Sequence, residues 1–334
     1  YLQELKEQGL IRHLGLTNFD AAHLRIVLAS GIDVVSNQVC FSLFDRRAQG
    51  AMSEACEEYD VKLLAFGTLA GGLLTDRFMG LLEPDEMRTW SEMKYKRFLD
   101  VAGDWDGYQE LLRTLASLAA KHDVSLANVA SRYILEQPAV GGVIIGARLG
   151  ESEHIEDNLR LFEFTLDADD QAQIEAALAE FAPIPGDCGD EYRKPPFLTA
   201  SGDLSHHIDD SPPPYGVREH DDGRRRVLSG TPWEEHFGYC RAIREGRRIW
   251  VSGTTASHGE RLIGGNDAAA QAHFAIDKID GALQSLGGCL EDVVRTHVFV
   301  ANLSDWQAVA GVHGERFGAI LPANTLVQAR LVGE

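Results

Sequence analysis

Four short apolar segments in the first half of the chain each end in a cluster of polar or glycine residues. Segments of this length, alternating with stretches of helical periodicity, are typical of parallel sheets with crossover helices. In a parallel α/β barrel the carboxyl ends of the strands form the binding edge, so we expect the four clusters to form one site. The segments and their clusters are Ile11–Leu16 with Thr17–Phe19, Val34–Ser36 with Asn37 and Gln38, Val61–Phe66 with Gly67 and Thr68, and Val143–Ile145 with Gly146–Arg148.

Only four strand-helix units can be counted, whereas a closed barrel needs eight. The chain opens at Tyr1 inside a pattern with helical spacing, without an initiator Met, and stops at Glu334 inside an alternating pattern. We therefore expect half a barrel within an internal fragment of a longer protein.

Composition narrows the class of protein. The chain has 334 residues, 44% of them hydrophobic, which is enough for two globular domains. Its net charge of -20 argues against binding to nucleic acid or to an anionic membrane, and no apolar run is long enough to span a bilayer. The five cysteines are scattered without a Cys-x-x-Cys pair, which favours reduced thiols in the cytoplasm and no metal site.

The sequence predicts three regions. Residues 1–182 carry the α/β pattern, residues 183–229 form a Pro-rich linker, and residues 230–334 form an α+β domain. His206 and His207 lie beside two aspartates in the linker, where we expect a solvated loop and no metal ligands. The elements predicted for the last region are a hairpin of Tyr239–Ile243 and Arg248–Ser252, helices over Asn266–Leu286 and Asp305–Phe317, and strands over Val293–Val300 and Thr325–Val332.

The stretch Leu74–Gly107 interrupts the strand-helix alternation. It places Trp90, Tyr95, Phe98 and Trp105 among charged residues, so we expect a loop with short helices. Two interpretations are open: the stretch covers a pocket, or its aromatic residues form a small core of their own.

The first region resembles the C-terminal half of an aldo-keto reductase. The resemblance implies a half TIM (β/α)8 barrel that binds NADPH and serves the reduction of a small aldehyde or ketone. The residues that carry it are Gly9–Phe19, Asn37–Val39, Leu64–Leu69 with Gly72–Leu74, Gly146–Arg148, and Asp157 with Asn158.

The same resemblance implies residue roles. Asn18 and Gln38 match the residues that bind the nicotinamide carboxamide, and Phe66 matches the aromatic residue that stacks on the nicotinamide. Alternatively, Asn18 and Gln38 cap strand ends and Phe66 is a core residue. Arg148 matches the residue beside the adenosine 2'-phosphate, because a guanidinium suits phosphate and adenine, which favours NADPH over NADH. The remaining expected cofactor-binding residues are Gly67, Thr68, Leu69, Gly72, Gly146, Ala147 and Asn158.

In that family the catalytic Tyr and its Lys, Asp and His partners lie on the first four strand units. The residue pattern here corresponds to the last four units, so we expect cofactor-binding residues and no catalytic acid in this chain.

Residues 230–334 resemble the reactive intermediate deaminase (Rid, or YjgF-like) family, whose α+β fold is chorismate mutase-like. Members form homotrimers with clefts between subunits, and an Arg that follows Pro-Ala holds the carboxylate of an imino acid. Here Asn324 takes that position, and a neutral amide cannot make the charged bidentate contact. We expect Tyr239, Asn324 and Thr325 to line the cleft. The segments that carry the resemblance are Gly238–Ala242, Val251–Thr254, Gln271, Glu291–Val294 and Pro322–Thr325.

The sequence therefore predicts an NADPH-dependent aldo-keto reductase fused to a Rid-like domain. The alternative is a Rid-like module for binding a small ligand or for trimerisation, joined to a degenerate, non-catalytic barrel.

Overall fold

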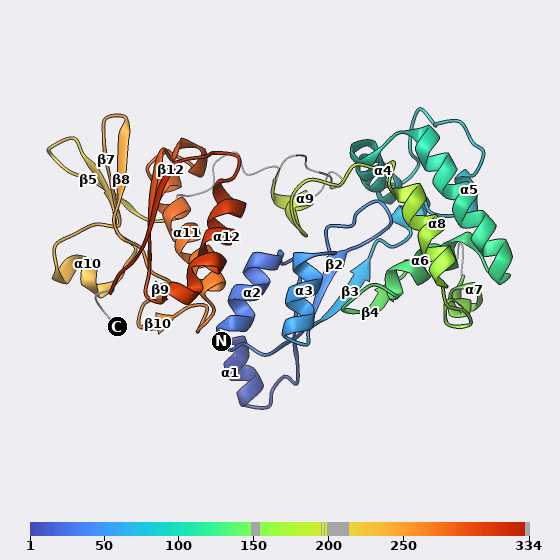
Figure 1. Cartoon of the computed structure of the whole chain (residues 1–334), viewed down its shortest axis with the longest axis horizontal. Coiled ribbons are helices and arrows are strands. Elements are labelled where there is room, and N and C mark those ends of the chain that lie inside the picture. Colours follow the sequence, from blue (N-terminus) through green and yellow to red (C-terminus); the bar gives the residue numbers. More distant parts are fainter. Residues whose placement is uncertain (148–153, 195, 197, 199–213, 331–334) are drawn as a thin grey trace. The chain divides into compact units, whose positions relative to one another are not determined.

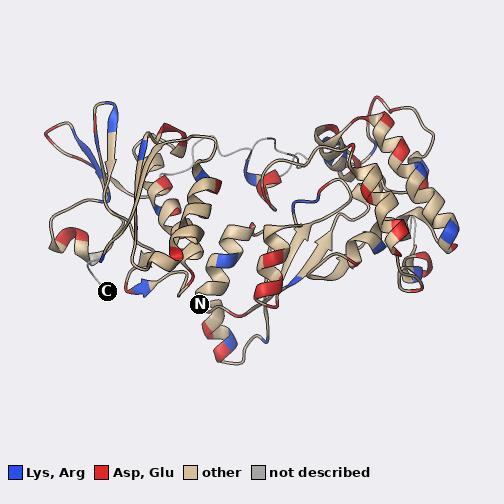
Figure 2. Ribbon diagram, viewed as in Figure 1, with Lys and Arg blue, Asp and Glu red and all other residues tan. Residues whose placement is uncertain are grey.

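The computed structural model of the chain describes residues 1–147, 154–194, 196, 198 and 214–330 (Figure 1). The chain forms two compact units, Tyr1–Ala21 with Asp33–Asp209, and Ala22–Ile32 with Asp210–Glu334. Helix α2 (Ala21–Ala29) therefore groups almost wholly with the second unit. Acidic side chains are spread over the helices of both units (Figure 2). Within the described ranges, no helix is long and apolar enough to cross a membrane.

The first unit is built on a four-stranded parallel sheet in the order β1-β2-β3-β4. All four predicted strands exist, and the parallel α/β fold predicted for this region is confirmed. The second strand is longer than predicted and reaches past Gln38. The strands are β1 (Leu14–Thr17), β2 (Val34–Cys40), β3 (Lys62–Phe66) and β4 (Val140–Ile144).

The two faces of this sheet differ in burial. Side chains alternate between the faces along a strand, and Val39, Leu63 and Ala65 on one face are fully buried. On the other face Phe66 is half-buried, and Ile144 is 42% exposed. One face therefore packs under helices, and the other is not fully covered by the described part of the chain.

Helices follow the strands as the sequence predicts, with one difference in the stretch Leu74–Gly107. There the structure has one long helix, α4, capped by the Thr89 side chain, which accepts a hydrogen bond from the Glu92 amide. Its apolar side buries Tyr95 and Phe98, and this periodicity was masked by the charged residues between them. The helices are α1 (Leu2–Glu7), α3 (Ala51–Glu58), α4 (Trp90–Ala102), α5 (Trp105–His122), α6 (Leu126–Leu135), α7 (Ile155–Leu159) and α8 (Ala168–Leu178).

Residues 183–229, for which the sequence predicts a linker, contain ordered elements. Helix α9 (Asp190–Arg193) belongs to the first unit, and strands β5 (Val217–Glu219) and β6 (Arg225–Val227) belong to the second. These elements are too short to show a periodic pattern, and the neighbouring Pro and Gly residues are typical of linkers. The pair His206 and His207 lies outside the described residues.

The second unit has the predicted α+β order. In the described part of residues 210–334, an antiparallel sheet β5-β6-β7-β8 and a parallel pair β11-β12 accompany two long helices and a short one. Val227, Ala242, Ala282 and Leu286 form one core cluster. The elements are α10 (Pro232–His236), β7 (Ala242–Glu245), β8 (Arg248–Val251), β9 (Ser257–His258), β10 (Arg261–Leu262), α11 (Ala268–Ser285), β11 (Arg295–Val300), α12 (Trp306–Phe317) and β12 (Ala323–Gln328).

The open face of the first sheet predicts self-association of the first unit. A segment of residues 1–198 is expected to form concentration-dependent oligomers in light scattering, because association buries the apolar part of that face. Ile144→Glu is expected to weaken association by about tenfold or more, the effect of losing roughly one buried side chain. Ile155→Glu, which changes an exposed residue of α7, is the matched control. A monodisperse monomer at every concentration would contradict the prediction.

Candidate cofactor site at the carboxyl ends of the sheet

Asn18 and Gln38 lie together, as predicted. Thr17 pairs with Gln38 in the parallel register, and the Asn18 amide donates a hydrogen bond of 2.9 Å to the Gln38 carbonyl. Asn18 has a φ of 57°, in the left-handed region that Asn tolerates better than most residues, so the chain turns sharply where the strand ends. Its Oδ1 atom is buried and has no hydrogen-bond partner among the described residues.

Phe66 ends the next strand on the same face of the sheet. Cys40 pairs with Phe66, and Cys40 lies two residues after Gln38, so the side chains of Gln38 and Phe66 point to one side. The structure therefore brings an unpartnered amide oxygen, a Gln side chain and an aromatic ring to one edge. Polar and aromatic groups placed together in this way are what a nicotinamide ring would need around it.

The loop after β3 packs against helix α4. A Cβ atom on Gly67 would lie 2.2 Å from the Tyr95 Oη, and one on Gly71 would lie 2.7 Å from the Ser91 carbonyl oxygen. The absence of side chains at these two positions is thus required by the helix. That the backbone of this loop also approaches the pyrophosphate of a dinucleotide stays a prediction.

Thr68 and Leu69, two other residues of this loop that are expected to bind the cofactor, differ in their hydrogen bonds. The Thr68 Oγ1 is buried and has no hydrogen-bond partner within the described ranges. The Leu69 carbonyl accepts hydrogen bonds from the amides of Gly72 and Leu74, which closes the loop into a single turn.

The fourth strand ends at the same edge. Gly146 and Ala147 follow it and are exposed, while Arg148 lies outside the described residues. Asn158 is a half-buried residue of α7. Its neighbour Asp157 accepts a 2.7 Å hydrogen bond from the Ser125 Oγ, which ties the start of α6 to α7.

Helix α9 and the residues before it pack on this edge, which the sequence did not predict. Arg193 donates a hydrogen bond of 3.0 Å to the Asn18 carbonyl, and the Ala21 amide donates one of 2.8 Å to the Asp187 carboxylate. Gly189 is so close that a Cβ atom there would lie 2.3 Å from the Asn18 carbonyl oxygen. The segment therefore closes directly over the end of β1.

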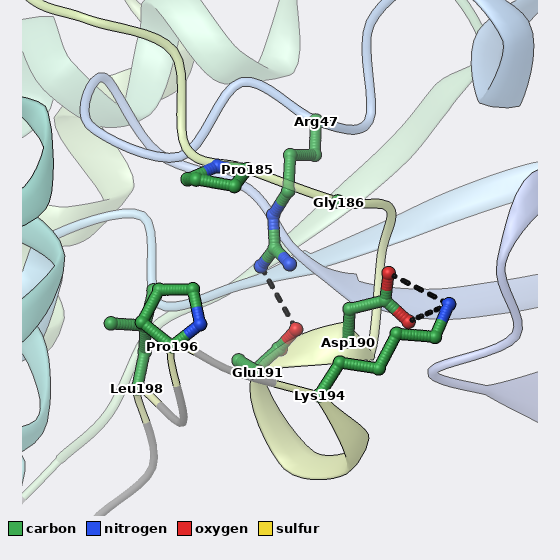
Figure 3. Close-up of a pocket in the computed structure, with 8 residues that line it drawn as sticks. All are labelled: Arg47, Pro185, Gly186, Asp190, Glu191, Lys194, Pro196 and Leu198. Carbon is green, nitrogen blue, oxygen red and sulfur yellow. Dashed lines mark hydrogen bonds and ion pairs between the residues drawn. The ribbon is translucent and has the colours of Figure 1, made fainter. Parts of the chain in front are cut away.

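A buried ionic network holds this segment in place (Figure 3). The Arg47 guanidinium makes two hydrogen bonds to Asp45, at 2.7 and 2.8 Å, and one of 2.9 Å to Glu191. The Arg47 side chain is 4% exposed, and those of Asp45 and Glu191 are 1% and 0% exposed. Burial raises the pKa of Glu191, and the positive charge of Arg47 opposes this rise. The guanidinium is therefore the main compensation for two buried carboxylates.

Lys94 of α4 is another residue near the predicted site that the sequence analysis did not identify. Its ammonium lies 5.4 Å from the centroid of the Phe66 ring and 5.1 Å from the rings of both Tyr95 and Tyr192. It also donates a hydrogen bond of 3.0 Å to the Tyr192 hydroxyl. Of the two interpretations of Leu74–Gly107, the burial of Tyr95 and Phe98 supports the apolar core, and the covering of a pocket stays a prediction.

The three residues predicted for the cleft of the second unit do not share one face. Asn324 and Thr325 are consecutive in β12, so their side chains point to opposite sides of the β11-β12 pair. The Asn324 amide donates hydrogen bonds of 2.9 Å to the Thr296 Oγ1 and 3.1 Å to the His313 Nε2. Tyr239 is 38% exposed. Burial lowers the pKa of His313, so this ring is neutral at pH 7.

Comparison with known families identifies both halves. Residues 1–179 match the Aldo/keto reductase family model, and the chain belongs to this family. Residues 234–334 match the model of the family described as Endoribonuclease L-PSP. Both resemblances that the sequence motifs carried are confirmed.

Individual relatives cover parts of the chain. Uncharacterized protein SCO2049 of Streptomyces coelicolor is 42% identical over 103 residues, which are 31% of this chain and 77% of that protein. The NADH-specific methylglyoxal reductase of Escherichia coli is 26% identical over 184 residues, 54% of this chain and 52% of that enzyme. The crystal structure of Rv2704 from Mycobacterium tuberculosis, a YjgF/YER057c/UK114 family member, is 40% identical with a TM-score of 0.30 and covers 33% of this chain and 88% of that one. The chain spans about half the length of the oxidoreductases that it matches.

The ionic network predicts a large effect of Arg47→Met. Removing the guanidinium leaves two buried carboxylates unpaired, which is expected to lower the free energy of unfolding at pH 7 by about 3–5 kcal/mol. Because burial raises the pKa of Glu191, the unpaired group is protonated more readily, and the deficit is expected to shrink as the pH falls from 7 toward 5. Thermal unfolding at both pH values measures this.

Arg46→Met is the matched control, since the Arg46 side chain is 25% exposed and its carboxylate partner Glu175 is 52% exposed. Its expected cost is at most about 1 kcal/mol. Equal effects of the two substitutions would show that the buried network does not stabilise the unit.

Proposed function

We propose that this chain supplies the cofactor-binding half of a cytoplasmic, NADPH-dependent oxidoreductase that reduces a small aldehyde or ketone. Membership of the aldo/keto reductase family supports an oxidoreductase. The observation that carries the proposal is the strand edge itself, where the amide of Asn18, whose Oδ1 is buried without a partner among the described residues, donates to the Gln38 carbonyl, and Gln38 and Phe66 lie on one face of the sheet.

The residues at this edge fit a nicotinamide group. A carboxamide has both donors and acceptors, so Asn18, just after β1, and Gln38, near the end of β2, can bind it from neighbouring strands. The unpartnered Oδ1 of Asn18 can accept from its amide nitrogen, and the Phe66 ring offers an aromatic wall. The cofactor would supply the hydride, and the protein side chains would orient the ring and hold it at the edge of the sheet.

NADPH in preference to NADH is the finer part of the proposal. It depends on Arg148, since a guanidinium binds a phosphate with charge-assisted hydrogen bonds. The relative from Escherichia coli is named as an NADH-specific enzyme. The nucleotide preference therefore needs a direct measurement on this protein.

Arg148→Ala is expected to weaken the binding of NADPH by about ten- to a hundredfold, since a hydrogen bond to a charged group contributes roughly 1.5–3 kcal/mol. The binding of NADH is expected to change little. Titration of nicotinamide fluorescence measures both affinities. Arg160→Ala, in a partly exposed side chain at the end of α7, is the control.

Equal affinity of the wild type for NADPH and NADH would contradict the nucleotide preference. No binding of either dinucleotide to the wild-type chain would contradict the proposed function, and would favour the alternative of a degenerate, non-catalytic barrel.

For the second unit we propose a homotrimeric, Rid-like module that binds a small ligand without hydrolysing imino acids. The observation that supports this is Asn324, whose side chain is engaged by Thr296 and the neutral His313. No formal positive charge is present in this hydrogen-bonded group to hold a carboxylate.

Ammonia release from freshly generated 2-iminopropanoate is expected to stay at background with the wild-type chain. Asn324→Arg adds a guanidinium at this position and is expected to raise release, because the substrate carboxylate gains a charged partner. Asn324→Gln, which keeps a neutral amide, is the control. Robust ammonia release by the wild type would contradict the proposal that this module does not hydrolyse imino acids. The molar mass from multi-angle light scattering tests whether the module is a trimer.

A further inference from the structure

The ammonium of Lys94 lies among three aromatic rings that come from three separate segments. Phe66 ends strand β3, Tyr95 is on helix α4 and Tyr192 is on helix α9. Aromatic faces attract a cation electrostatically, so this arrangement fixes the position of the charge. The hydrogen bond from Lys94 to the Tyr192 hydroxyl fixes it further.

This cation has unused capacity to bind an anion. An ammonium carries three donors, and the structure shows one of them bonded, to Tyr192. Among the described residues, Lys94 forms no ion pair with a carboxylate; the Glu191 carboxylate raises its pKa but binds Arg47 directly. The nearby cation Arg47 differs, because two carboxylates already bind it.

Lys94 is charged at neutral pH. Burial lowers the pKa of Lys94, but the ionisable groups of Cys40 and Tyr192, the hydrogen bond to the Tyr192 hydroxyl and the Glu191 carboxylate raise it more, and the net direction is upward. Lys94 is half-buried as a residue, and two of its three ammonium donors have no hydrogen-bond partner among the described residues. Water at such a site can be displaced by an oxyanion, which would gain a charge-assisted hydrogen bond.

We propose that Lys94 selects carbonyl substrates that also bear a carboxylate, such as aldehydes or ketones of organic acids. This inference rests on the proposed function, because Phe66 is the residue expected to contact the nicotinamide, and a substrate carbonyl must lie near that ring. In a chain of net charge -20, a fixed local cation is needed to favour an anionic substrate. Tyr192 is the positioning residue, since it holds the ammonium.

The test is binding of 4-formylbenzoate and of its neutral methyl ester to the 334-residue chain, measured by titration calorimetry without dinucleotide. Wild type is expected to bind the carboxylate at least about tenfold more tightly than the ester. Lys94→Met is expected to abolish this preference by weakening only the carboxylate. Lys94→Arg keeps the charge and is expected to retain most of the preference, and Tyr192→Phe to reduce it partly.

Lys96→Met is the matched control, because Lys96 lies on the same helix but is already paired with Glu83 and Asp100. It is expected to leave the preference unchanged. Circular dichroism and the thermal midpoint show whether each variant is folded. If Lys94→Met does not fold, the affinities of Lys94→Gln and Tyr192→Phe for the carboxylate and for the ester test the proposal instead.

The proposal would be overturned if wild type bound the carboxylate no more tightly than the ester. It would also be overturned if Lys94→Met lost affinity for the acid and the ester equally, or lost affinity for neither. If Lys94→Met instead only tightens dinucleotide binding, the lysine obstructs the Phe66 ring and does not select substrate. A separate titration with NADPH distinguishes the two proposals, since absent dinucleotide binding with an intact carboxylate preference contradicts the proposed function alone.

Discussion

Parallel pairing of β1 to β4 is the constraint on which the candidate site depends. It aligns the ends of four strands that are far apart in the sequence, and it places Gln38 and Phe66 on one face. The helix-covered face holds Val39, Leu63 and Ala65 instead. A slip of one residue would exchange the two sets and bury the Gln38 amide in an apolar layer, so the same burial that stabilises the sheet also fixes the position of the site.

The part of this arrangement that could be predicted is the part encoded locally. Apolar segments of strand length, followed by polar residues, were sufficient to predict that Asn18 and Gln38 lie together on neighbouring strands, although β2 continues two residues beyond Gln38 to Cys40. The position of Lys94 could not be predicted in this way, because it depends on aromatic residues from three segments. Helix α9 has four residues, which is less than two helical turns, and its contacts with Asn18 and Arg47 are long-range.

The glycines after β3 show how one sequence signal can have two physical causes. A Gly-rich loop at a strand end allows the backbone to approach either a ligand or another part of the protein. In this structure Gly67 and Gly71 admit Tyr95 and Ser91 of α4. The same close approach brings Lys94, on that helix, next to the Phe66 ring. The glycines therefore contribute to the candidate site through the helix they admit, whether or not they also contact a phosphate.

The hydrogen-bonded groups around Lys94 and around Asn324 differ in charge, although the neighbouring Thr325 accepts a hydrogen bond of 3.3 Å from Arg295. In the first unit, Lys94 and Arg47 both contact helix α9. Arg47 binds the Asp45 and Glu191 carboxylates, whereas Lys94 binds the Tyr192 hydroxyl. In the second unit Asn324, Thr296 and His313 form a group that is neutral at pH 7. A fixed cation favours an anionic ligand, whereas a neutral group of donors and acceptors favours a ligand without formal charge. On the proposals above, the carboxylate-selective cation is therefore Lys94 of the first unit, although the resemblance of the second unit is the one that implies carboxylate binding.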